Sequence, residues 1–175
     1  MPSPANRVAL YGALAIGLYT IENLLPSPLP WLRIGIANVA VVLALDELGI
    51  GPAWAVFILK LVVGSIFVGR FWTPFFWFAA VGGTASLALM TITKFVLGGS
   101  VTIVGTSIIG GFVHNIAQLA LARLVLVPNN SVWLLLPIFG FLGIGTGALV
   151  GVVARLVQLR LIHGPKTSRQ PLIRS

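Results

Sequence analysis

The sequence predicts an all-α membrane protein, a polytopic bundle of about six transmembrane helices. Of its 175 residues, 58% are hydrophobic and only 8% are charged. So few polar side chains cannot cover a water-soluble globule, and the solvent of most of the surface is therefore a lipid bilayer. In addition, the apolar residues form long runs, and a helix needs roughly 20 such residues to cross the hydrocarbon core.

The apolar runs are separated by short connections. We predict six spans, over residues 8–25, 34–48, 52–68, 72–97, 101–127 and 132–160. The second and third are short and are joined only by residues 46–52, so they form either a tight helical hairpin or re-entrant pieces, and the count is five or six. We expect one integral membrane domain over residues 1–162 and a basic cytoplasmic tail over residues 163–175.

The first apolar run has the position of a secretory signal peptide, because Arg7 precedes it. No small-residue cleavage site follows the run, however, and Glu22 with the prolines of residues 26–30 marks a helix end. We interpret this run as a retained first span.

Positive charge is concentrated near the C-terminus. The net charge is +8, and five of the eleven Lys and Arg residues are Arg155, Arg160, Lys166, Arg169 and Arg174. The other basic residues are scattered, so a tail at a membrane surface explains the charge better than a nucleic-acid partner does. Cytoplasmic segments of membrane proteins carry an excess of Lys and Arg, so an even number of spans places both termini in the cytoplasm.

Small residues recur at every fourth position in two of the predicted spans. One such face is formed by Ala9, Ala13 and Gly17, and the other by Gly143, Gly147 and Gly151. A helix face without bulky side chains lets another helix approach closely. Two interpretations stay open for each face: packing inside the bundle, and docking to another membrane subunit.

Polar side chains inside the predicted spans are the candidates for function, because such groups are costly in a bilayer. In the fifth span, His114 and Gln118 are four residues apart and share a helix face, with Asn115 adjacent. Asn38 lies about one turn into the second span, and Arg70 lies near the outer surface. We predict that these five residues contribute to one outward-facing site whose positive excess suits a polar or anionic ligand.

Structural explanations exist for the same groups. Glu22 can pair with Arg33 or Arg70, and Lys60 either lines the cavity or extends along its aliphatic stem toward an interface. The polar residues of the fifth span can bridge helices through hydrogen bonds. The aromatic residues around Arg70 are typical of an interfacial belt and also suit a cavity wall.

Several kinds of catalysis are excluded by residues that the sequence lacks. Its only acidic residues are Glu22, Asp46 and Glu47, which are too few for an aspartate-rich diphosphate site with two metal ions. The sequence has no cysteine, no Gly-x-Ser-x-Gly motif and no Gly-x-x-x-x-Gly-Lys-Ser/Thr phosphate loop. We therefore expect no enzymatic activity, no metal site and no cofactor, and we expect ATP-driven work to need another subunit.

Three stretches resemble a known family. They are IGIANV (34–39) continuing into VLAL (42–45), KLVVGS (60–65) with the later GGTAS (82–86), and GGFVHNIAQL (110–119). They resemble the Gx transporter family, also labelled heptaprenyl diphosphate synthase component I. The resemblance covers roughly Leu32 to Val153, and its most specific part is the His-Asn-x-x-Gln element.

The two labels of this family imply different functions. The family looks related to the substrate-binding S components of energy-coupling factor (ECF) transporters, six-helix proteins that bind a small molecule near the outer face of the bacterial cytoplasmic membrane. The resemblance then implies that Ala9, Ala13 and Gly17 dock a transmembrane coupling subunit, which two cytoplasmic ATPases drive. The other label implies a non-catalytic membrane partner of a prenyl diphosphate synthase that binds a prenyl diphosphate or a related lipid. A purely structural membrane protein is a third alternative.

Overall fold

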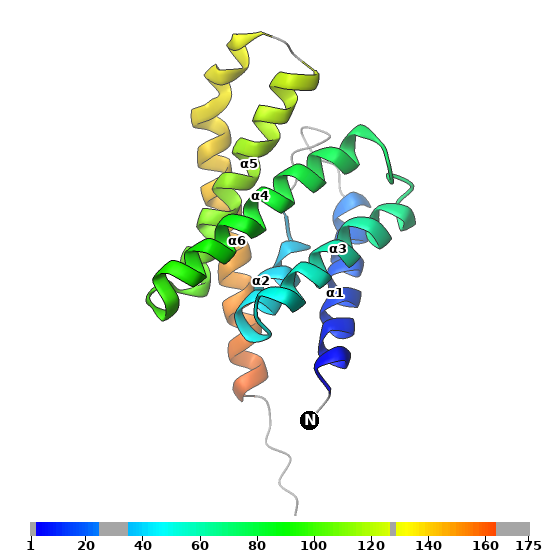
Figure 1. Cartoon of the computed structure of the whole chain (residues 1–175), viewed down its shortest axis with the longest axis vertical. Coiled ribbons are helices and arrows are strands. Elements are labelled where there is room, and N and C mark those ends of the chain that lie inside the picture. Colours follow the sequence, from blue (N-terminus) through cyan, green and yellow to red (C-terminus); the bar gives the residue numbers. More distant parts are fainter. Residues whose placement is uncertain (1–2, 25–34, 127–128, 164–175) are drawn as a thin grey trace, which may run out of the picture.

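The computed structural model describes residues 3–24, 35–126 and 129–163 (Figure 1). Within these residues the chain forms six α-helices and no strand, which confirms the all-α prediction. The helices are α1 (Pro4–Leu24), α2 (Asn38–Glu47), α3 (Ile50–Phe67), α4 (Pro74–Leu97), α5 (Ile103–Val125) and α6 (Leu136–His163). Short 3₁₀ segments, Gly98–Ser100 and Asn130–Leu135, precede α5 and α6.

Four segments of the described chain are long and apolar enough to cross a bilayer. They are α3, α4, α5 and Asn130–Arg160, which contains most of α6. Helix α1 has the length, but it is less apolar than these four. Helix α2 has only 10 residues, about 15 Å at 1.5 Å per residue, and is too short to cross a hydrocarbon core of about 30 Å. The predicted span 34–48 is thus a short helix.

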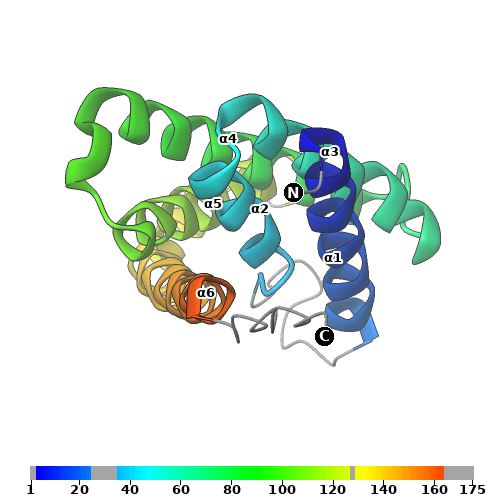
Figure 2. The same cartoon turned by 90° about the horizontal axis from the view of Figure 1, so that it is seen from below.

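The start of α1 and the end of α6 lie at the same end of the molecule, which we call the terminal end (Figures 1 and 2). Polar contacts join four helices there. Arg7 of α1 pairs with Glu47 at the end of α2, at 2.8 Å. The neighbouring Asp46 accepts from Lys94 of α4 at 2.6 Å and from Gln158 of α6 at 2.8 Å.

Parts of the sequence prediction fall outside the described residues. These parts are Arg33, the prolines of residues 26–30, and the predicted basic tail apart from His163.

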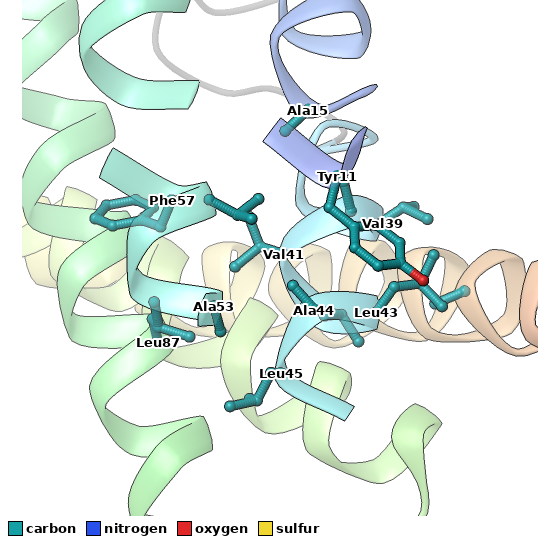
Figure 3. Packing of buried hydrophobic residues seen from close by; sticks show 14 of the residues in the cluster. Tyr11, Ala15, Val39, Val41, Leu43, Ala44, Leu45, Ala53, Phe57 and Leu87 are labelled. Carbon is teal, nitrogen blue, oxygen red and sulfur yellow. The ribbon is translucent and has the colours of Figure 1, made fainter. Parts of the chain in front are cut away.

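Helix α2 is enclosed by the rest of the bundle. Each residue of Val39–Leu45 is at most 3% exposed, and the helix packs against α1, α3, α5 and α6. Figure 3 shows Tyr11 of α1, Phe57 of α3 and Leu87 of α4 among its surroundings. A helix that is apolar on all sides is stable only when it is covered on all sides. The shortest helix is therefore the centre of the core.

Helices α5 and α6 approach closely through the glycine face of α6. A Cβ atom at Gly147 would lie 2.5 Å from the carbonyl oxygen of Ser107, and one at Gly143 would lie 2.6 Å from that of Gly111. A Cβ at Gly151 would lie 2.7 Å from an α5 backbone atom. No side chain fits at these distances, so this small-residue face packs inside the bundle.

The small-residue face of α1 is arranged differently. Ala9, Ala13 and Gly17 are all exposed, and a Cβ at Gly17 would meet nothing within 4 Å. The buried face of α1 is the opposite one, which includes Tyr11 and Ala15. The same sequence pattern therefore serves internal packing in α6 and leaves an uncovered surface on α1.

Candidate functional site

Polar side chains meet inside the bundle, in the half away from the terminal end. Two small cavities lie there and share Gly35, Asn38 and His114. One of them, which we call the outer cavity, has a volume of about 50 Å³. Its further lining includes Tyr19, Glu22, Lys60, Phe75 and Gln118. The other, which we call the inner cavity, has a volume of about 40 Å³. Its further lining includes Val42, Ser86, Ser107, Asn115 and Thr146. Four of the five predicted site residues, Asn38, His114, Asn115 and Gln118, line one or both of these cavities.

Lys60 brings a positive charge into the outer cavity. Its residue is 7% exposed, and its Nζ donates a hydrogen bond to Oδ1 of Asn38 at 2.5 Å. The same Nζ lies 5.3 Å from the ring centroid of Phe57. Of the two interpretations of Lys60, the geometry agrees with a cavity-lining position and not with extension to an interface. Lys60 therefore lines the same cavity as Asn38, His114 and Gln118.

Glu22 contacts the turn that begins α2. Its carboxylate accepts hydrogen bonds from the backbone N–H groups of Gly35 and Ala37, the second at 3.4 Å. Gly35 has a φ of 81°, a left-handed conformation that glycine adopts without strain. A carboxylate at a helix N-terminus is favourable because the helix dipole is positive there. Within the described part of the chain, Glu22 forms no ion pair with Arg70.

Helix α5 directs His114 and Gln118 toward Gly82 of α4. A Cβ atom at Gly82 would lie 3.0 Å from Cε1 of His114 and 3.0 Å from Cγ of Gln118. The absence of a side chain at this position therefore makes room for both polar groups. Oε1 of Gln118 is buried and has no hydrogen-bond partner among the described residues, whereas the imidazole of His114 has the backbone of Gly82 as a neighbour and hydrogen-bond partner. A buried polar atom left unpaired costs about 1–3 kcal/mol, which favours a ligand that would pair it.

The amide nitrogens of α5 bridge helices. Nδ2 of Asn115 donates to the carbonyl oxygen of Phe139 in α6 at 3.2 Å, and Nε2 of Gln118 donates to that of Phe78 in α4 at 3.4 Å. Such bonds agree with the structural explanation of these residues, in which their side chains bridge neighbouring helices. Asn115 also lines the inner cavity and Gln118 the outer one, so each has both a bridging position and a cavity-lining position.

Arg70 is the predicted site residue that lines neither cavity. Its guanidinium lies 5.0 Å from the ring centroid of Phe75, and that ring lines the outer cavity. Nη1 of Arg70 is buried without a hydrogen-bond partner within the described ranges. The structure therefore brings Asn38, His114, Asn115 and Gln118 together and places Arg70 behind the wall formed by Phe75.

Sequence reasoning missed the hydroxyl groups around the cavities. The hydroxyls of Tyr19 and Ser65 lie 3.3 Å apart and link α1 to α3. Ser86, Ser107 and Thr146 come from three different helices and line the inner cavity. Serine and threonine are common in membrane helices, where they also bond to carbonyls of their own helix, as Thr146 does. Their sequence positions therefore carry no distinctive signal.

The two cavities offer groups suited to binding a polar molecule. They present an ammonium, a carboxylate, an imidazole, amides and hydroxyls within an otherwise apolar bundle. No cluster of three or more His, Cys, Asp or Glu side chains capable of holding a metal ion occurs in the described residues. The arrangement therefore supports recognition of a small ligand by hydrogen bonds and charge.

A protein-family model matches most of the chain. The match covers residues 11–157, and the family is described as heptaprenyl diphosphate synthase component I. The matched range contains all five predicted site residues, and also Ala13 and Gly17, whereas Ala9 lies just before it. No curated protein and no solved structure matches the chain. The resemblance of the three sequence stretches is thereby confirmed, and the chain belongs to the heptaprenyl diphosphate synthase component I family.

Proposed function

We propose that the chain is the substrate-binding membrane component of an ECF-type importer, and that it binds a small polar or anionic molecule. The observation that carries this proposal is the buried polar site around Lys60, Asn38, His114 and Gln118. Ionisable residues at membrane depth are expensive and commonly mark substrate pathways. The site lies in the half away from the terminal end, which is the outer half if the terminal end is cytoplasmic.

The open face of α1 supports the coupling part of this proposal. Ala9, Ala13 and Gly17 are exposed, and a flat helix face permits close contact with a membrane helix of another protein. We assign this face to a transmembrane coupling subunit, with two cytoplasmic ATPases as its partners. The sequence has no phosphate loop of its own, so the energy must come from such partners.

The proposed location is the bacterial cytoplasmic membrane, with both termini in the cytoplasm. Arg7 and Arg155 lie near the terminal end, as their contacts with Glu47 and Gln158 show. An excess of basic residues at that end agrees with a cytoplasmic position. In the sequence, the predicted tail contains three further basic residues, Lys166, Arg169 and Arg174.

Reconstitution tests this proposal. The purified chain is combined with an ECF coupling module in liposomes, and ATP-dependent uptake is measured for the small molecules that co-purify with the chain in mild detergent. The proposal requires uptake that depends on both the chain and ATP. Binding of no small molecule, or uptake that is indifferent to the chain, would contradict it.

A second candidate function is that of a non-catalytic membrane partner of a prenyl diphosphate synthase. One observation favours it: an apolar groove of about 470 Å³ lies between α4 and α5, lined by Trp72, Pro74, Trp77, Phe78, Val81, Leu121 and Val125. This volume falls within the range of ligand pockets, about 300–1,000 Å³, and apolar walls suit a hydrocarbon chain. Co-purification of a prenyl diphosphate and of a synthase subunit would favour this function over the importer.

A further inference from the structure

The ammonium of Lys60 forms no ion pair with a carboxylate among the described residues. The chain contains three acidic residues, and two of them, Asp46 and Glu47, form ion pairs at the terminal end. The third, Glu22, lines the same cavity as Lys60, but within the described residues no carboxylate oxygen lies within 4.0 Å of the lysine nitrogen. A buried charge is strongly disfavoured unless it is paired.

Most of the bonding capacity of this ammonium is unused. An ammonium has three N–H donors, and the described structure gives Lys60 one hydrogen bond, to the neutral amide of Asn38. Glu22 acts on Lys60 only from beyond ion-pair distance, and its carboxylate accepts from the two backbone N–H groups at the start of α2. Because the Lys60 side chain lines the outer cavity, its other two N–H donors are available to a ligand there.

We infer that the outer cavity is an anion site and that the ligand is a small monocarboxylic acid whose carboxylate pairs with Lys60 beside Asn38. This inference deepens the proposed function and rests on it for the use of the site. Lys60 and Arg70, the latter behind Phe75, supply two positive charges, and Glu22 supplies one negative charge. One further negative charge balances this set. The unpaired Oε1 of Gln118 is an acceptor for a hydroxyl or amine group elsewhere on the ligand.

Two features favour a carboxylate over a phosphate. Phosphate sites typically combine Lys or Arg side chains with the free N–H groups of a helix N-terminus. Here Glu22 already occupies the N-terminus of α2, and a dianion would be repelled by that carboxylate. The volume of about 50 Å³ also limits the bound group to a few atoms, with the hydroxyl-lined inner cavity beyond Asn38 and His114 available to a polar substituent.

Matched acids and amides test this inference without knowledge of the natural ligand. Thermal unfolding of the detergent-purified chain is measured with acetate, glycolate and lactate, and with acetamide, glycolamide and lactamide, at equal pH and ionic strength. We expect at least one acid to raise the melting temperature in a saturable manner while its amide, of nearly the same shape, does not. Inorganic phosphate is included as the other anion.

Three variants assign the effect to the site. Lys60→Met should fold with an unchanged or higher melting temperature, because it removes an unpaired buried charge, and it should weaken the response to the acids at least tenfold. Asn38→Asp supplies a carboxylate to Lys60 from within the chain, so it should also abolish the response. Lys94→Met makes the same chemical change at the lysine that pairs with Asp46, and it should keep the response even if its melting temperature falls.

Several outcomes would overturn the inference. These are an equal response to acids and amides, a response retained in Lys60→Met or Asn38→Asp, or stabilisation by phosphate alone. If a neutral molecule is bound and transported, the importer stands and the carboxylate inference fails. If acids bind through Lys60 but no coupling module supports uptake, the carboxylate site stands and the importer fails.

Discussion

The amide oxygen of Asn38 accepts a hydrogen bond from the ammonium of Lys60 at 2.5 Å, and this contact joins the first residue of α2 to the middle of α3. The other end of α2 carries Asp46 and Glu47, which bind residues of α1, α4 and α6. One short helix, buried over Val39–Leu45, therefore connects the polar cavities to the terminal end.

Replacement of Gln118 by leucine should weaken ligand binding more than folding. The change removes Oε1, which is unpaired in the described structure, at nearly constant volume. If a ligand group is left without its partner, the cost is about 1–3 kcal/mol, which corresponds to a roughly tenfold or larger loss of affinity. Isothermal titration with the co-purified molecule measures affinity, and melting of the same samples measures stability.

Two further variants separate the ligand role from helix bridging. His114→Ala should also lower the affinity, whereas Asn115→Leu, which loses the bond to Phe139, should mainly lower the melting temperature. Unchanged affinity in both Gln118→Leu and His114→Ala would leave these polar groups as interhelical bridges without a ligand site.

Alanine substitutions at two glycines should affect ligand binding differently. At Gly82 the added Cβ meets His114 and Gln118 at 3.0 Å, so Gly82→Ala should displace both side chains and reduce binding. At Gly17 nothing lies within 4 Å, and Gly17→Ala should leave binding intact and raise helix stability by up to about 1 kcal/mol. Equal binding by the two variants would show that the space at Gly82 has no part in recognition.

Large substitutions on the two small-residue faces should separate docking from packing. Ala13→Leu adds bulk to an exposed face of α1, so the isolated chain should fold normally while its complex with a coupling subunit weakens. Gly147→Leu places a side chain where only 2.5 Å separates a Cβ from the backbone of α5, and the chain should fail to fold. Folding is followed by size-exclusion chromatography and melting, and docking by co-purification. Normal co-purification of Ala13→Leu would remove the docking assignment.

The termini should be accessible from the cytoplasmic side only. The chain contains no cysteine, so single substitutions Ser3→Cys and Ser175→Cys give unambiguous labelling sites. A membrane-impermeant maleimide should label neither site in intact cells and both in inverted vesicles. Labelling of one site from outside would require an odd number of spans.

The helices were predictable from the sequence because long apolar runs are a direct signal of membrane helices. The predicted span 72–97 corresponds to Pro74–Leu97, and 101–127 to Ile103–Val125. The character of α2 was not predictable, because a uniformly apolar segment looks alike whether lipid or protein surrounds it. Its enclosure by neighbouring helices became apparent only from the packing.

The candidate site was predictable in its residue types and not in its contacts. Asn38, His114 and Gln118 stand out as polar groups in apolar segments, and the structure brings them to adjoining cavities. The bond between Asn38 and Lys60 joins residues 22 positions apart, and no local pattern indicates such a pairing. Similarly, the small-residue faces of α1 and α6 have the same four-residue spacing but different surroundings. The spacing predicts a flat helix face, and it does not indicate what covers that face.

Mass spectrometry of what co-purifies with the chain in mild detergent tests most directly whether the polar cavities bind a small molecule. Wild type and Gln118→Leu are compared at equal folded fraction. We expect a small polar or anionic species bound to the wild type and reduced by roughly tenfold or more in the variant. Equal amounts in both, or a prenyl diphosphate or other lipid as the only bound species, would contradict it.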